Sequence, residues 1–286
     1  MKYTIKDFNK QFKTDADCLE YIYRNKYPDG ATCAQCGRKD QFYPLEGRRS
    51  YSCACGHHIS PTVGTIFHKS PTSLKSWFTA IFLMMTSKNG VSAKELERHL
   101  GVTYKCAWRI SHQIRQLLKE DRLTLQGTVE ADETFIGGKR PGDQGKRDKT
   151  PIMGIVERGG NVVAKVVEDV SARTLLPVIV EKVLPQSTIY TDEWKPYRRL
   201  IHRDFKHDSV NHGKKEYVRA LVHTNSIEGF WSQLKRSIHG TFHSVSREHL
   251  QKYVNEFSYR YNRRKSGKAM FLHALDGVGA LHEPAV

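Results

Sequence analysis

Three acidic residues stand where metal-dependent chemistry on phosphodiesters would need them. Asp132 lies inside a β-prone run, residues 129–136, where an acid is disfavoured and therefore suggests a function. Asp192 ends the β-branched run that begins at Thr188, and Glu228 opens a later helical segment. Mg²⁺ prefers carboxylate and phosphate oxygens, and two such ions can activate a nucleophile and stabilise a leaving oxygen. We therefore expect a two-ion Mg²⁺ or Mn²⁺ site at Asp132, Asp192 and Glu228.

Each of these acids also has an ordinary structural interpretation. Asp192 can cap a following turn, and Asp132 can form an ion pair with a lysine. Residues Asn225 to Glu228 have the spacing of a capping box, in which the Glu228 carboxylate accepts from the Asn225 backbone N–H. Taken alone, Glu228 is better explained as a capping residue, and only its combination with the two aspartates favours a metal ligand.

Four cysteines are spaced like the ligands of a structural zinc ion. They are Cys33, Cys36, Cys53 and Cys55. Two short cysteine turns, each followed by glycine, supply the tetrahedral thiolate set that Zn²⁺ prefers. Because the second pair is one residue tighter than usual, His57 or His58 can replace one thiolate. We expect structural Zn²⁺ in a small module, with four buried or incidental cysteines as the alternative.

The charge balance of the chain indicates a polyanionic partner. Lys and Arg total 46 against 30 acids, which gives a formal net charge of +16. Nucleic acid is the first candidate, because neutralising phosphates releases condensed counterions. Lys235 returns to the helix face of Glu228 seven residues on, where it can hold a DNA phosphate, and Arg236 is a further candidate DNA contact. With no signal peptide or membrane span in the sequence, we expect a soluble, cytoplasmic, nucleoid-associated protein with no membrane partner.

The elements that must position these residues fall into three predicted parts. Residues 1–70 hold the cysteine module, 71–122 have helical periodicity, and 123–286 change to strands and then helices. In the third part the pattern predicts strands at 128–136, 152–158, 162–167 and 187–192, a helix over 171–183, and two further helices. We therefore expect an α/β domain with a mixed sheet flanked by helices, preceded by a zinc ribbon and a helical module.

Residues 90–118 have the pattern of a helix-turn-helix. A first helix over 92–100 is followed by a turn at Gly101 and by a second helix with a polar, basic face. The basic side chains expected to contact DNA are Lys105, Arg109 and Arg115. Such a pair places its second helix in the major groove. The alternative is an ordinary helical hairpin with a solvated charged face.

Three segments, in this order, carry a family resemblance. They are VEADETFIGGK at 129–139, YTDE at 190–193 and HTNSIEGFW at 223–231. Together with the cysteine pairs they resemble the DDE insertion-sequence transposases that have a zinc ribbon and an RNase H-like catalytic domain, and the resemblance covers nearly the whole chain. It implies that Asp132, Asp192 and Glu228 are the catalytic acids, with Lys235 beside them. Some members carry Asn at the third position, which leaves Asn225 as an alternative. We favour Glu228 because a carboxylate binds Mg²⁺ better than a neutral amide does.

The resemblance also implies a reaction and its partners. The expected partner is double-stranded DNA, both the terminal repeats of a mobile element and target DNA, bound by a homodimer or higher oligomer. Water would free a 3′-OH at the element end, and that 3′-OH would attack a target phosphodiester. The alternatives are a non-enzymatic DNA-binding regulator derived from a transposase and a nuclease without strand transfer. Acids placed on strands of a basic domain favour the enzyme, since a binder has no use for them.

Overall fold

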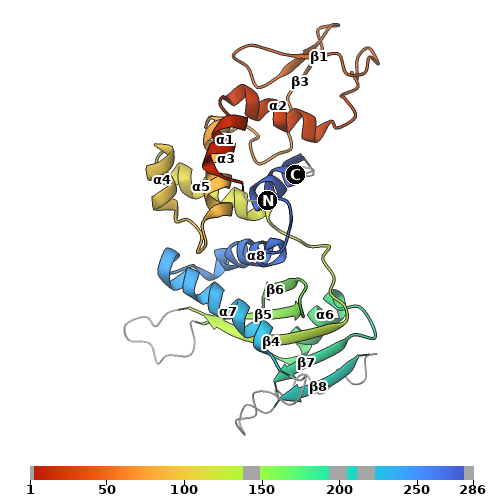
Figure 1. Cartoon of the computed structure of the whole chain (residues 1–286), viewed down its shortest axis with the longest axis vertical. Helices are drawn as coiled ribbons and strands as arrows, with labels where there is room; N and C mark the ends of the chain where they lie inside the picture. The colour runs from red at the N-terminus through yellow and green to blue at the C-terminus, as the bar shows by residue number, and fades with distance from the viewer. Residues whose placement is uncertain (1–2, 138–148, 193–204, 211–222, 280–286) are drawn as a thin grey trace. The chain divides into compact units, whose positions relative to one another are not determined.

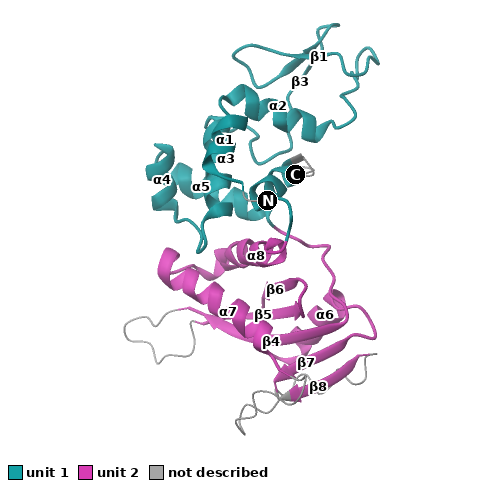
Figure 2. Ribbon diagram, in the orientation of Figure 1, with its two compact units in different colours: residues 1–118, 266–286 teal, residues 119–265 magenta. Residues whose placement is uncertain are grey.

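The computed structural model describes residues 3–137, 149–192, 205–210 and 223–279 (Figure 1). The chain divides into two compact units, residues 1–118 with 266–286 and residues 119–265 (Figure 2). Within the described ranges, no helix combines the length and apolar character that crossing a membrane requires.

The first unit combines a small sheet with a helical bundle. Its strands are β1 (Phe42–Pro44), β2 (Tyr51–Cys53) and β3 (His58–Ile59), which pair antiparallel in that order. Its helices are α1 (Ile5–Gln11), α2 (Asp15–Lys26), α3 (Leu74–Thr86), α4 (Ala93–Leu100), α5 (Tyr104–Leu117) and α9 (Met270–Gly279). The helices α4 and α5 lie where the sequence predicts a helix pair, and Gly101 ends α4 in the left-handed conformation, at φ 63°. Gly is suited to that position because it lacks a Cβ.

The helix α9 packs with the first unit, although the sequence-based division places it in the part spanning 123–286. It contacts α2 and α3, and Asn25 donates hydrogen bonds to the Leu275 and Asp276 carbonyls at 2.9 and 3.0 Å. Phe271 lies 1% exposed against the rings of Phe8 and Phe12. Contacts between residues so far apart in the chain leave no local pattern in the sequence.

The second unit is built on a five-stranded sheet in the order β6-β5-β4-β7-β8. The strands are β4 (Thr128–Ile136), β5 (Thr150–Glu157), β6 (Val162–Val166), β7 (Thr188–Asp192) and β8 (Lys206–Val210). The first three pair antiparallel, whereas β7 and β8 run parallel to β4. Four of the five strands lie where the sequence predicts them. The strand β8 was not predicted, because its residues are mostly polar and show no apolar alternation.

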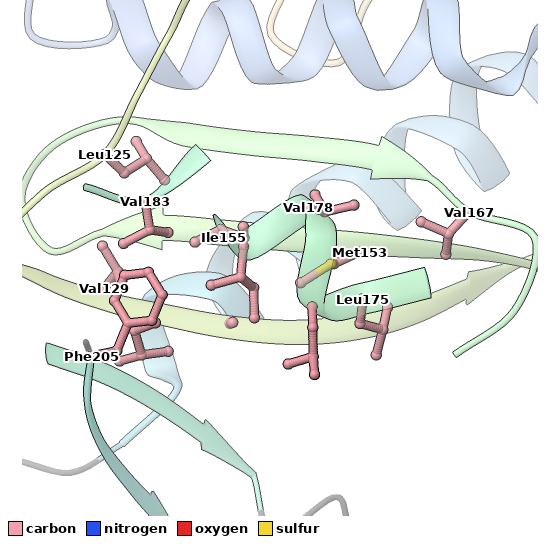
Figure 3. Packing of buried hydrophobic residues seen from close by; sticks show 13 residues of the cluster. Leu125, Val129, Met153, Ile155, Val167, Leu175, Val178, Val183 and Phe205 are labelled. Atoms are coloured by element: carbon pink, nitrogen blue, oxygen red, sulfur yellow. The ribbon is translucent and has the colours of Figure 1, made fainter. Parts of the chain in front are cut away.

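Helices cover both faces of this sheet. The helix α6 (Ala172–Lys182) packs on one face, where its Leu175 and Val178 join Met153 of β5 in a buried cluster (Figure 3). On the other face lie α7 (Asn225–Ser237), its π-helical extension η3 (Ile238–Phe242) and α8 (Arg247–Arg263). Successive side chains of a strand alternate between faces. Val129 and Ala131 therefore belong to the α6 cluster, whereas Glu130 and Asp132 face α7.

A mixed sheet with three antiparallel and two parallel strands, flanked by helices, confirms the predicted fold class. The arrangement is RNase H-like, and it places the carboxyl end of β7 next to β4. Hydrophobic clusters on either side of the sheet hold these strands in place.

Candidate active site and zinc centre

The four predicted cysteines converge on one point. All four Sγ atoms lie within 4.8 Å of one another, with Cys33 to Cys55 at 3.5 Å and Cys36 to Cys53 at 3.6 Å. Around a Zn²⁺ ion with bonds of about 2.3 Å, tetrahedral sulfurs are roughly 3.8 Å apart. The thiols therefore fit zinc.

Left-handed glycines shape both cysteine turns. Gly37 and Gly56 have φ angles of 72° and 88°, which residues with a Cβ adopt only at a cost. The ligand group contains no histidine, so neither His57 nor His58 replaces a thiolate among the described residues. The cysteine cluster is thus complete as a four-thiol set.

Strand pairing brings the first two acids together. The parallel register of β4 and β7 matches Thr128 with Thr188 and Glu130 with Tyr190. Continued by two residues, this register would pair Asp132 with Asp192. Alternate residues of a strand share a face, so both side chains would lie on the face of Glu130 and Tyr190. The helix α7 crosses that face, with contacts to β4, and Glu228 lies in its first turn.

The charge environment of Asp132 includes the other two acids. Burial, and after it the negative charges of Asp192 and Glu228, raise the pKa of the Asp132 carboxyl to about 6. Hydrogen bonds from the Glu133 backbone and from Trp231 act in the opposite direction. A group of carboxylates that repel one another in a partly buried place favours a bound cation.

The three carboxylates form a more open group than the thiols. Among the described residues, only the four cysteines bring three or more potential ligand atoms within 4.8 Å of one another. An open group is compatible with two ions about 3.5–4 Å apart, which need ligands on both sides. The donor set contains only carboxylates, the oxygen ligands that Mg²⁺ and Mn²⁺ prefer.

A second acid of β4 has a different role, which the sequence did not predict. Glu130 is fully buried, and its Oε2 accepts hydrogen bonds from the backbone N–H groups of Ser226 and Ile227 at 2.8 and 3.1 Å. Its Oε1 pairs with Arg158 at 2.7 Å and lies 3.3 Å from His223 Nδ1. Glu130 therefore caps the N-terminus of α7 from the neighbouring strand.

The capping box expected from the sequence does not form. The N-cap of α7 is Thr224, which makes no side-chain cap hydrogen bond, and the Asn225 N–H donates to His223 Nδ1 at 3.4 Å. Glu228 instead accepts a hydrogen bond from the Thr224 hydroxyl at 3.0 Å. With Glu130 satisfying the first N–H groups of the helix, the Glu228 carboxylate is not needed as a cap.

The remaining predicted residues lie on two helices. On α7, Asn225 and Arg236 are exposed and Lys235 is partly buried in the last turn. On α5, Lys105 and Arg109 are exposed, and Arg109 also donates to the Ser70 hydroxyl at 3.2 Å. Arg115 is only 1% exposed, because it lies on the inner face of α5. The structure therefore excludes Arg115 from the exposed basic face of that helix.

Sequence comparisons identify relatives for most of the chain. Residues 124–262 match the family model described as an ISXO2-like transposase domain. The chain is 36% identical over 101 residues to an uncharacterised transposase-like protein of Haemophilus influenzae, covering 35% of this chain and 80% of that protein. It is 26% identical over 285 residues to an uncharacterised protein in the transposable element ISH50 of Halobacterium salinarum, covering 91% of this chain and 95% of that one.

The similarity to solved structures is more distant. The Mos1 strand transfer complex contains a chain with 11% identity and a TM-score of 0.29, over 72% of this chain and 79% of that chain. A likeness this distant supports no conclusion about function. The sequence relatives do support a conclusion about function, because the transposase-like protein is matched over most of its length. The family model spans the five-stranded sheet with α6, α7 and nearly all of α8. The chain belongs to the insertion-sequence transposases, with an ISXO2-like transposase domain over residues 124–262.

Proposed function

We propose that this transposase cuts and joins DNA with two divalent metal ions held by Asp132, Asp192 and Glu228. The observation that carries the proposal is the parallel register of β4 and β7, which, continued by two residues, would pair Asp132 with Asp192 on the face of the sheet that α7 covers. The raised pKa of Asp132, caused by burial and then by its acidic neighbours, supports the same grouping.

The residues of the site divide the work between them. Bound Mg²⁺ or Mn²⁺ would supply activation of the attacking oxygen and stabilisation of the leaving oxygen. The sheet holds Asp132 and Asp192 on a rigid frame, and Glu130 fixes the end of α7 from which Glu228 extends. Lys235, two turns further along α7, would hold a phosphate of the DNA strand. Water and then a freed 3′-OH would be the successive nucleophiles.

The first unit would recognise DNA. We assign one structural Zn²⁺ to the four-thiol cluster, since a three-stranded sheet of this size has little core of its own. The exposed Lys105 and Arg109 of α5 are the proposed contacts to terminal-repeat DNA, with Arg236 contributing from the catalytic unit. Assembly as a homodimer or higher oligomer on DNA completes the proposal.

A cleavage assay with labelled terminal-repeat DNA and Mg²⁺ tests the chemistry. Asp132→Asn and Asp192→Asn remove a metal ligand at nearly constant size, so each should lower the cleavage rate by roughly 10³-fold, while folding and DNA binding survive. The wild-type protein should give both nicked and joined products. Tight binding by the wild-type protein without any cut DNA would instead indicate a DNA-binding regulator, and nicked products without joining would indicate a nuclease.

The third ligand is tested by a matched pair of variants on α7. Glu228→Gln should abolish cleavage with little change in stability, because the cap of this helix comes from Glu130. Asn225→Ala should retain cleavage, since its exposed side chain is not among the proposed ligands. The opposite result, with cleavage lost in Asn225→Ala and kept in Glu228→Gln, would move the third role to Asn225.

A further inference from the structure

A buried indole touches the first proposed metal ligand. Trp231 on α7 is 4% exposed, and its Nε1–H donates a hydrogen bond to Asp132 Oδ2 at 2.9 Å. Trp231 lies three residues after Glu228, which is about one helical turn. The helix α7 therefore carries the proposed ligand Glu228 and, one turn later, the indole of Trp231 that holds the proposed ligand Asp132.

The strand next to Asp132 makes room for this indole. Gly154 of β5 is the direct partner of Asp132 across the antiparallel ladder. A Cβ at Gly154 would lie 2.5 Å from Trp231 Cζ2 and 2.8 Å from Ile227 Cδ1, distances that real Cβ atoms essentially never show. The backbone of Gly154 is not in the left-handed region, so the reason for glycine here is space for the ring and not backbone freedom.

The chemistry of an indole suits a fixed support for a carboxylate. Its N–H is a donor only and does not titrate in the range where the acids do. By occupying one direction on Oδ2, it restricts rotation of the Asp132 carboxylate, which also accepts a hydrogen bond from the Glu133 backbone. A neutral donor also stabilises the charged form of the carboxylate without adding a positive charge that would repel metal.

We propose that Trp231 is a positioning residue that presents Asp132 to divalent metal, and that Gly154 is the residue that lets it do so. The inference rests on the proposed function, because it takes Asp132 to be a metal ligand. It goes beyond that function by assigning the metal affinity of the site to a contact between α7 and the sheet. Partners of this kind, one step removed from the metal, typically change metal affinity about 10–100-fold.

The test measures Mn²⁺ binding to the full-length, zinc-loaded protein by electron paramagnetic resonance of free Mn²⁺, without any need for turnover. Trp231→Phe keeps an aromatic ring but removes the N–H, so Mn²⁺ should bind about 10-fold more weakly. The matched control is Trp77→Phe, since the buried Trp77 indole also donates to a side-chain oxygen, Ser70 Oγ, at 3.0 Å, but in the first unit. That control should lose a similar hydrogen bond and keep wild-type Mn²⁺ affinity.

A second variant separates positioning from folding. Gly154→Ala keeps the indole but pushes it away from Asp132, so it should weaken Mn²⁺ binding as Trp231→Phe does. In the double variant the smaller phenyl ring should relieve the clash with the indole and recover part of the thermal stability, while Mn²⁺ affinity stays low. A merely structural role for the ring predicts that affinity recovers together with stability, and that result would overturn the inference.

Asp132→Asn distinguishes failure of the inference from failure of the proposed function. If Asp132→Asn loses Mn²⁺ affinity while Trp231→Phe binds like the wild-type protein, Trp231 does not position the ligand and the proposed function stands. If the wild-type protein and Asp132→Asn bind Mn²⁺ equally, Asp132 is not a ligand and both ideas are wrong.

Discussion

The cysteine cluster of the first unit and the carboxylate group of the second are assembled in opposite ways. The four thiols come from one stretch of chain, with Cys33 and Cys55 only 22 residues apart, and they lie within 4.8 Å of one another. The carboxylates come from β4, β7 and α7 and are spread over residues 132–228. One group is tight and local, and the other is open and depends on the packing of a whole domain.

Under the proposed function, this difference would separate a metal that builds structure from metals that perform chemistry. The ribbon has short strands and its cysteines supply part of its small interior, so the ion would take the place of a core. The carboxylates lie on a sheet already covered by hydrophobic clusters on both faces. Loss of zinc should therefore unfold the cysteine module, whereas loss of the divalent ions should leave the second unit folded but inactive.

The largest expected effect is loss of zinc from the ribbon. Cys36→Ser removes one ligand of four, and structural zinc contributes about 10–16 kcal/mol to the folding of zinc-finger peptides, so the ribbon should not remain folded. Zinc content by elemental analysis and protease sensitivity of residues 30–60 measure the result. Cys106→Ser is the control, because Cys106 lies outside the cluster and its Sγ forms a hydrogen bond with the Thr72 hydroxyl. A zinc-free protein in which residues 30–60 resist protease would contradict a structural role for zinc.

The second prediction contrasts two acids on the same face of β4. Glu130→Gln breaks a buried ion pair with Arg158 and weakens the cap of α7, so the free energy of unfolding should fall by about 3 kcal/mol. Asp132→Asn should leave the free energy of unfolding unchanged or slightly higher, because one of several repelling negative charges is removed. Denaturant unfolding measures both.

Glu181→Gln serves as the surface control for that measurement. Glu181 pairs with Lys182 but is half-exposed, and exposed ion pairs contribute little to stability. Equal losses of stability in the Glu130 and Asp132 variants would mean that the two acids do not divide into a structural and a chemical one.

The smallest expected effect concerns the exposed basic face of α5. Lys105→Ala and Arg109→Ala should each weaken binding to terminal-repeat DNA and lower the slope of log K against log salt by about 0.9, which corresponds to one phosphate contact. Folding should be unchanged, since both side chains are exposed. Lys10→Ala, an exposed lysine of α1, removes the same charge and should leave the slope as it is. Unchanged slopes in both α5 variants would remove this face from DNA recognition.

Patterns contained in a few consecutive residues were sufficient to predict much of the molecule. The strand β4 begins at Thr128 and ends at Ile136 as predicted, and β7 ends at Asp192. The cysteine spacing identified a set of thiols that the structure brings together. These features could be predicted because alternation, turn glycines and ligand spacing are local properties of the chain.

Only the tertiary structure decided which acid supports the helix and which faces it. Glu130 and Asp132 share one face of one strand, and although the family resemblance singles out Asp132 as a catalytic acid, no local pattern assigns a role to Glu130. The packing of α7 across β4 gives Glu130 the backbone N–H groups of the helix and gives Asp132 the indole of Trp231. The polar strand β8 and the place of α9 in the first unit were decided in the same way. Partners about a hundred residues away are set by how helices pack on the sheet, which no short stretch of sequence contains.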